Sequence, residues 1–261
     1  MKLDKNAIET FRRRGWLVVE KVFTRDETER IAKIAWEISQ DNLKSEAPKG
    51  YLVDHDAEGK AQPRKVDHPF WRREEFRKFV LDQRVKDLVG QLVDDPNPLL
   101  ATDQIFMKPP RFGSAKPYHQ DNFYFQMFPA DKVITAWIAL DDVDESNGCL
   151  RYIDGSHLGP ILSHDPVPGE PHNLAPKPEL IDLKKESLAI VGMGGIVFHH
   201  SQTLHTSHRN ESERWRRAYA THWVTADVKC KNDVLDDAYF HTNYTSPPPK
   251  KEKKAVAAGA P

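Results

Sequence analysis

The stretch Pro117-Tyr118-His119-Gln120-Asp121-Asn122 sets a histidine and a carboxylate one residue apart, and the stretch Leu204-His205-Thr206-Ser207-His208 adds imidazoles much later in the chain. Side chains at positions i and i+2 of an extended segment point to the same side. His119 and Asp121 are therefore expected to project together, with His205 arriving from another strand. Two imidazoles and one carboxylate can hold non-haem Fe(II) on one face and leave positions open for substrates.

An H-x-D tripeptide is common in proteins, so the third ligand needs support of its own. Four other histidines compete with His205 for this position: His199, His200, His208 and His222. His199 and His200 end an apolar run, where one of the two is expected to face the core. Zinc uses the same ligand types, but no glutamate adjoins a histidine as in the H-E-x-x-H motif.

The composition is that of an ordinary globular protein. The 261 residues are 39% hydrophobic and 30% charged, which suits one large domain with a core. The formal net charge of −1 gives no support to nucleic-acid binding. No run approaches the roughly 18 apolar residues of a membrane helix, and the N-terminus does not resemble a signal peptide. The only cysteines, Cys149 and Cys230, cannot build a disulfide framework, so we expect a cytoplasmic location.

The first 98 residues are expected to be mainly helical. Residues 5–14 form a short amphipathic pattern that ends near Gly15, followed by an apolar strand at 16–19. Thr24 and Glu27 match a capping box, in which each side chain satisfies a backbone N–H of the other, ahead of apolar residues at helical spacing.

Two longer segments complete this part of the chain. Residues 44–69 are polar with scattered glycine and proline, which predicts a long loop and a candidate lid. Residues 74–93 carry apolar side chains at helical spacing, which predicts one further helix.

From Leu99 onward, short β-rich runs alternate with turn signals such as Asn147-Gly148. The runs are 104–107, 133–140, 149–153, 187–191, 195–199 and 217–224. Helices followed by many short strands predict an α+β protein, mainly β, whose body is a sandwich or jelly roll. We expect one domain over residues 1–245, with a helical part at 1–98 and a β core at 99–228. Residues 246–261 are rich in proline, lysine and alanine, which predicts a disordered, solvated tail.

Several of these pieces together resemble the phytanoyl-CoA dioxygenase family of Fe(II)/2-oxoglutarate oxygenases. The matching pieces are Phe106-Met107-Lys108-Pro109-Pro110, Tyr118-His119-Gln120-Asp121-Asn122, Ala136-Trp137-Ile138-Ala139-Leu140-Asp141-Asp142, residues 145–157, Leu204-His205-Thr206-Ser207 and residues 216–222. They keep the family's order and spacing across about residues 99–224. The resemblance implies a double-stranded β-helix, a jelly-roll or cupin-like barrel flanked by N-terminal helices, with iron in its mouth.

The resemblance also assigns roles to individual residues. His119 and Asp121 match the H-x-D pair, His205 the distal ligand, and Arg216 the arginine that grips the distal carboxylate of 2-oxoglutarate. Ser207 and Trp137 match co-substrate positions, and Lys65 matches a lysine near the co-substrate. Thr206, His208 and Asp154 depart from the family pattern, where glycine or proline is usual. Asp121 is present, unlike in related halogenases, so hydroxylation is favoured.

The implied function is hydroxylation of a small organic substrate by Fe(II), O₂ and 2-oxoglutarate, with release of succinate and CO₂. The substrate is expected to enter between residues 44–69 and the aromatic run 122–128, and Lys108, Arg111 and Arg151 are candidates to receive an anionic group. Two alternatives remain open: a catalytically silent metal- and 2-oxoglutarate-binding module, and a zinc-dependent hydrolase. The primary substrate and the oligomeric state cannot be read from the sequence.

Overall fold

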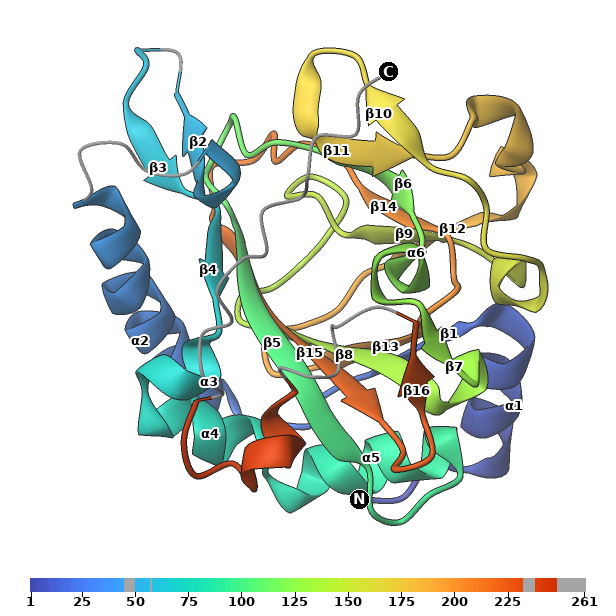
Figure 1. The fold of residues 1–261 in the computed structure, drawn as a ribbon. Coiled ribbons are helices and arrows are strands. Elements are labelled where there is room, and N and C mark those ends of the chain that lie inside the picture. The colour runs from blue at the N-terminus through green and yellow to red at the C-terminus, as the bar shows by residue number, and fades with distance from the viewer. Residues whose placement is uncertain (45–49, 57, 232–237, 248–261) are drawn as a thin grey trace, which may run out of the picture.

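The computed structural model describes residues 1–44, 50–56, 58–231 and 238–247, and most of the predicted tail lies outside these residues. Two antiparallel sheets face each other and form the double-stranded β-helix (Figure 1). The larger sheet has the strand order β1-β13-β8-β15-β5-β4, and the smaller sheet β12-β9-β14-β6. The predicted fold class is therefore confirmed.

The larger sheet comprises β1 (Trp16–Val19), β4 (Lys65–Asp67), β5 (Leu99–Lys108), β8 (Val133–Ala139), β13 (Ile196–His200) and β15 (Arg216–Val224). The smaller sheet comprises β6 (Lys116–His119), β9 (Leu150–Ile153), β12 (Glu186–Ala189) and β14 (His205–Ser207). Three further two-stranded pairs lie outside them: β2 (Val53–His55) with β3 (Ala61–Pro63), β7 (Met127–Phe128) with β16 (Lys229–Cys230), and β10 (Asp165–Val167) with β11 (Glu170–Ala175).

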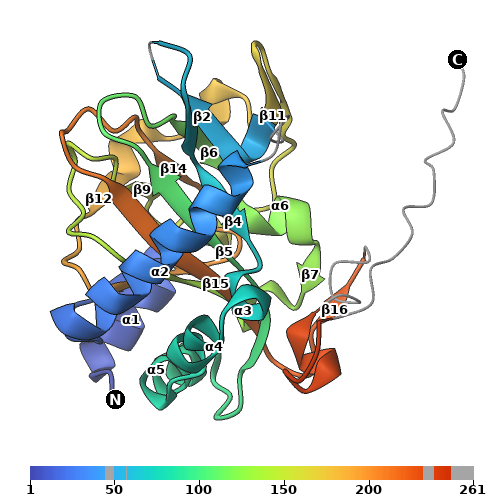
Figure 2. The ribbon, with the colours of Figure 1, turned by 90° about the vertical axis from the view of Figure 1, so that its left-hand side faces the viewer.

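Helices cover the outer face of the larger sheet (Figure 2). They are α1 (Lys5–Arg14), α2 (Arg25–Leu43), α3 (Pro69–Arg72), α4 (Glu74–Val80) and α5 (Gln83–Val93), while the short α6 (Asp121–Phe125) follows β6. The capping box of α2 is confirmed, since Thr24 Oγ1 accepts from Glu27 N and Glu27 Oε2 accepts from Thr24 N. The end of α1 at Gly15 is also confirmed.

Strand alternation divides the buried residues of the larger sheet into two sets. One set packs against the helices and includes Ile105, Ile134, Ala136, Ile138, Tyr219 and Trp223. The other set faces the smaller sheet and includes Trp137, Ala139, Val197, Ala218 and Ala220, which meet Tyr152 and Leu150 there. Every second side chain of a strand therefore points into the barrel, where a site can form.

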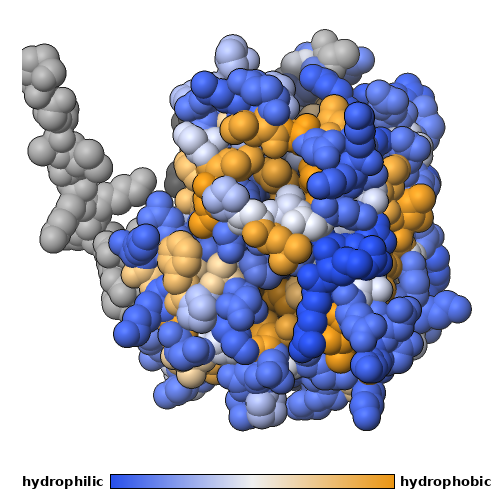
Figure 3. Space-filling view, turned by 90° about the vertical axis from the view of Figure 1, so that its right-hand side faces the viewer, coloured by the Kyte–Doolittle hydropathy of each residue, from blue (hydrophilic) through white to orange (hydrophobic). Residues whose placement is uncertain are grey.

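On the face shown in Figure 3, hydrophobic side chains reach the surface between hydrophilic ones.

Two of the predictions were wrong in detail. Residues 44–69 were predicted to be a long loop, but within the described residues they form the β2–β3 hairpin and β4, which pairs with β5. The predicted helix over 74–93 is two helices. Helix α4 ends at Val80, and the Asp82 carboxylate caps α5 by accepting from Arg84 N at 2.8 Å. A side chain that caps the next helix favours a break over continuation of the first.

Candidate metal and co-substrate site

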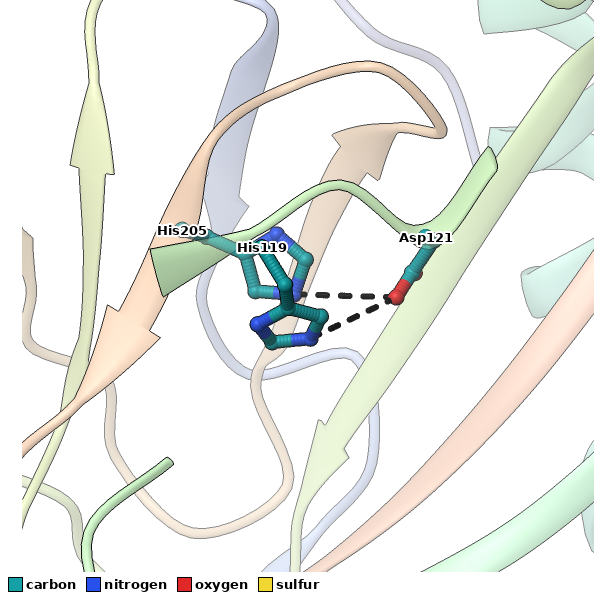
Figure 4. Close-up of side chains that lie close together, drawn as sticks. All are labelled: His119, Asp121 and His205. Carbon is teal, nitrogen blue, oxygen red and sulfur yellow. Dashed lines mark ion pairs between the residues drawn. The ribbon is translucent and has the colours of Figure 1, made fainter. Parts of the chain in front are cut away.

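His119 and His205 are neighbours across a strand pair of the smaller sheet. His119 is the last residue of β6 and lies opposite His205, the first residue of β14. Asp121 begins α6 two residues later, so the H-x-D segment is a strand end followed by a helix start. Figure 4 shows both rings turned toward the Asp121 carboxylate, with Nε2 of His119 at 3.7 Å and Nε2 of His205 at 3.8 Å from Oδ1.

The backbone fixes the proton of each histidine on the nitrogen that points away from this cluster. His119 Nδ1 lies 2.9 Å from the carbonyl oxygen of Pro117, and His205 Nδ1 lies 2.9 Å from that of Thr203. A carbonyl oxygen only accepts, so Nδ1 carries the hydrogen and Nε2 presents its lone pair. Burial lowers the pKa of His119 well below its usual range and that of His205 to about 4, which keeps both rings neutral.

The two oxygens of the Asp121 carboxylate have different partners. Oδ2 accepts from His199 Nε2 at 3.0 Å and from the Thr135 hydroxyl at 2.8 Å, which leaves Oδ1 toward the histidines. Burial alone would raise the pKa of Asp121, but the hydrogen bond from His199 and the surrounding imidazoles hold it well below the usual range. The carboxylate is therefore ionised. One anionic oxygen and two neutral imidazole nitrogens within 4.8 Å of one another fit a divalent iron.

A cavity of about 510 Å³ opens from this cluster between the two sheets. Its described lining includes all seven residues proposed from the sequence for metal or co-substrate: Lys65, His119, Asp121, Trp137, His205, Ser207 and Arg216. Residues of both predicted entrance segments also line it, namely Tyr51 and Arg64 on one side and Tyr124 and Phe125 on the other.

Arg216 is a buried cation without a carboxylate of its own in the described structure. Its side chain points into the barrel, and its guanidinium carbon lies 5.4 Å from the centre of the Trp137 ring. Its Nε has no hydrogen-bond partner among the described residues, and burial lowers its pKa to about 10. Buried charges are normally paired. A ligand carboxylate in the cavity would supply the missing partner.

The other two arginines of this segment face away from the cavity. Arg217 forms a bidentate ion pair with Asp141, and Arg214 pairs with Asp144 at the surface. The alternation of β15 thus separates Arg216 from Arg217, as the parity of Arg216, Ala218 and Ala220 predicted, while Arg214 precedes the strand. Lys65 lines the cavity but already pairs with Asp67 at 2.9 Å.

The four rival histidines fall into two groups. His199 contacts Asp121 directly, and His222 Nδ1 lies 2.9 Å from the Thr135 hydroxyl, so both support the carboxylate from behind. His200 packs beside His157 outside the cavity lining, and His208 is exposed. His208 therefore does not compete with His205 for the third ligand position.

The candidate anion-binding residues are also corrected by the structure. Arg111 is exposed and pairs with Glu213, while Arg151 is held by Glu145 and Glu186. The Lys108 ammonium lies at the cavity wall but donates to three backbone carbonyls, including those of Ser207 and His208. None of the three is placed to receive a substrate.

Sequence reasoning missed Thr135 and Tyr152, and it did not single out Lys116, which also lines the cavity. Thr135 lies on the same face of β8 as Trp137 and opposite His199 in register, so strand parity was the signal that could have found it. The Tyr152 hydroxyl lies 2.8 Å from His199 Nδ1. Its role depends on a pairing between β9 and β14 that leaves no local pattern in the sequence.

Comparison with known proteins agrees with this site. The family model described as Phytanoyl-CoA dioxygenase (PhyH) matches residues 11–218. The peroxisomal phytanoyl-CoA dioxygenase of Rattus norvegicus is 28% identical over 246 residues, covering 87% of this chain and 71% of the relative. A phytanoyl-CoA dioxygenase domain-containing protein 1 homolog of Caenorhabditis briggsae is 24% identical over 258 residues, covering 82% and 88%.

Solved structures share the fold. The non-haem α-ketoglutarate-dependent carbocyclase SnoK from nogalamycin biosynthesis superposes with a TM-score of 0.71 at 23% identity, covering 96% of this chain and 95% of that structure. EvdO2 from Micromonospora carbonacea var. aurantiaca, solved with 2-oxoglutarate, gives a TM-score of 0.66 at 22% identity, covering 88% and 96%.

A barrel of this type with a His-Asp-His cluster in its mouth defines a non-haem iron- and 2-oxoglutarate-dependent dioxygenase. The chain belongs to the phytanoyl-CoA dioxygenase family, whose model covers most of its length. Membership of a dioxygenase family favours an oxygenase over a zinc-dependent hydrolase. In the described part of the chain, every helix is too short or too polar to span a bilayer.

Proposed function

We propose that the enzyme hydroxylates a small organic molecule, with iron held by His119, Asp121 and His205. The observation that carries this proposal is the convergence of two neutral imidazole nitrogens and one anionic oxygen at the cavity floor. When bound there, iron with 2-oxoglutarate and O₂ supplies the oxidation, which converts a C–H bond to C–OH and releases succinate and CO₂.

The residues of this chain orient the reactants. Arg216 grips the distal carboxylate of 2-oxoglutarate, and the face of Trp137 and the β14 segment at Ser207 close the co-substrate side. Thr135 and His199 hold Asp121 so that only Oδ1 is offered to the metal. Aromatic side chains such as Phe106 and Tyr124 line the remaining space and limit the access of water.

We further propose that residues 1–245 act as one domain in a reducing compartment such as the cytoplasm. The helices and the larger sheet share one continuous hydrophobic core, which supports a single folding unit. Both cysteines are free thiols, which fits a reducing environment.

The test is succinate release from 2-oxoglutarate by Fe(II)-loaded protein, with metal content measured after anaerobic purification. His119→Ala and Asp121→Ala should lose stoichiometric iron and turnover, because each removes one of three ligands. His208→Ala is the matched control, since His208 is exposed and lies outside the described lining. Wild-type turnover in either ligand variant would sink the assignment.

A further inference from the structure

The cavity carries more positive charge than the proposed metal and co-substrate require. Its described lining holds five cationic side chains and one carboxylate: Arg64, Lys65, Lys108, Lys116 and Arg216 against Asp121. Divalent iron, Asp121 and doubly charged 2-oxoglutarate sum to one negative charge, which Arg216 neutralises. The remaining four cations therefore need partners from the protein or from another ligand.

Three of these four cations have interaction partners within the protein. Lys65 pairs with Asp67, Lys108 donates to three carbonyls, and Arg64 Nε lies 3.8 Å from Asp54. Lys116 differs, because its ammonium donates to the neutral amide oxygen of Asn173 at 2.8 Å. Within the described residues, no ion pair forms at Lys116.

Lys116 is held in position beside the metal cluster. Asn173 is itself fixed by donating to Glu170 at 2.6 Å, and the Lys116 ammonium lies 5.8 Å from the centre of the Tyr124 ring. The Tyr124 ring lies 6.3 Å from that of His119. Lys116 belongs to the smaller sheet, whereas Arg216 and Trp137 belong to the larger one. The two cations thus reach the cavity from opposite sheets.

We propose that Lys116, with Arg64 nearby, binds a negatively charged group of the primary substrate, and that the substrate joins this carboxylate or phosphate to an apolar or aromatic body. Burial, followed by repulsion from Arg64, lowers the pKa of Lys116 to about 8, and a bound anion would relieve that repulsion. The walls formed by Tyr51, Phe106 and Phe125 would accept the apolar part. This inference rests on the proposed function and names the substrate class for that site.

The test divides a small-metabolite extract on an anion exchanger into retained and unretained halves. Each half is added to Fe(II)-loaded enzyme with saturating 2-oxoglutarate labelled at C1, the carboxyl group that leaves as CO₂, and labelled CO₂ is counted. We expect only the retained half to stimulate CO₂ release. Lys116→Met should reduce this stimulation at least tenfold, Lys116→Arg should restore most of it, and the exposed Lys184→Met should respond like wild type. Phosphatase treatment of the retained half then separates a phosphate from a carboxylate.

The inference is overturned if the unretained half stimulates CO₂ release, or if neither half does. It is also overturned if Lys116→Met responds to the retained half as strongly as the wild type. A rise in the KM for 2-oxoglutarate as large as the lost stimulation would also overturn it, because Lys116 would then bind the co-substrate. Iron and 2-oxoglutarate binding by the wild-type protein are measured first. If the wild type binds neither iron nor 2-oxoglutarate, the proposed function itself is contradicted. If it binds both but Lys116→Met does not lose the stimulation, only the substrate class is contradicted.

Discussion

His199 donates from Nε2 to Oδ2 of Asp121 at 3.0 Å, whereas the two proposed histidine ligands lie nearest Oδ1. The Tyr152 hydroxyl lies 2.8 Å from the other ring nitrogen and so fixes the ring from behind. An outer contact of this kind orients a metal ligand and tunes its basicity. His199 is therefore a positioning residue for the metal site.

Replacing His199 should weaken metal binding without removing a ligand. His199→Phe is expected to lower the affinity for Fe(II) by about 10- to 100-fold, the usual effect of losing such a contact. The measurement is a titration with Mn(II), followed by electron paramagnetic resonance, under anaerobic conditions with Fe(II) as competitor. His199→Gln, which keeps a donor, should lose less. Unchanged affinity in the phenylalanine variant would show that Thr135 alone holds the carboxylate.

Arg216 and Arg217 allow a matched comparison of neighbouring arginines. Arg216→Gln should raise the KM for 2-oxoglutarate at least about 30-fold, because loss of one partner of a buried charge pair costs about 2 kcal/mol or more. Arg217→Gln removes the Asp141 ion pair outside the cavity and should cost stability while leaving that KM unchanged. Steady-state kinetics with varied 2-oxoglutarate distinguish the two.

Stability gives a second readout at the same position. Arg216→Met should raise the melting temperature of the protein without co-substrate, because it removes a buried cation that lacks a charged partner there. Added 2-oxoglutarate should then stabilise the wild type but not this variant. Equal stabilisation of both would contradict the assignment of Arg216.

The site was largely predictable where chemistry and strand parity coincide. The H-x-D pair needed only the rule that residues i and i+2 share a side, and Arg216 was separated from Arg217 by the same alternation. What failed depends on partners distant in sequence. The 44–69 segment is polar, yet β4 within it forms a strand because it pairs with β5, whose partner residues lie 37 to 41 positions later. Lys116 carries no local signal, because its contacts are with Asn173 and Tyr124 on other elements.

Asp103 should make stability depend on pH through a cluster outside the cavity. Its carboxylate is buried beneath the Tyr219 and Tyr239 hydroxyls and the Phe70 amide, and Tyr239 also contacts His68. Burial raises the pKa of Asp103 from 3.8 to about 7. The folded state therefore binds more protons than the unfolded state between these values. The contribution of Asp103 to the free energy of unfolding therefore falls as the pH rises from about 4 to 7, by up to about 4 kcal/mol.

Asp103→Asn isolates this contribution. Buried neutral histidines such as His200 change stability in the opposite direction, so wild type and variant are compared at each pH. Urea unfolding at pH 5 and pH 8 should show the stability of the wild type falling relative to the variant at the higher pH. A difference between the two proteins that does not change with pH would mean that Asp103 is ionised throughout.

Gly194 is a position where the fold requires glycine, and Gly59 provides the control. Both have positive φ, +86° at Gly194 and +80° at Gly59. A Cβ at Gly194 would lie 2.4 Å from the carbonyl oxygen of Phe23, which leads into the α2 cap, whereas a Cβ at Gly59 meets nothing within 4 Å. The same conformational strain is thus present at both sites, but a backbone clash at only one.

Gly194→Ala should therefore destabilise the protein by more than about 3 kcal/mol, the sum of left-handed strain and overpacking. Gly59→Ala should cost about 1 kcal/mol from strain alone. For a chain of this size, the first change lowers the melting temperature by roughly 6 °C or more and the second by a few degrees. Thermal unfolding of the two variants under identical conditions is the measurement. Equal losses would show that the β1–α2 connection moves aside, and that contact with Phe23 does not limit this turn.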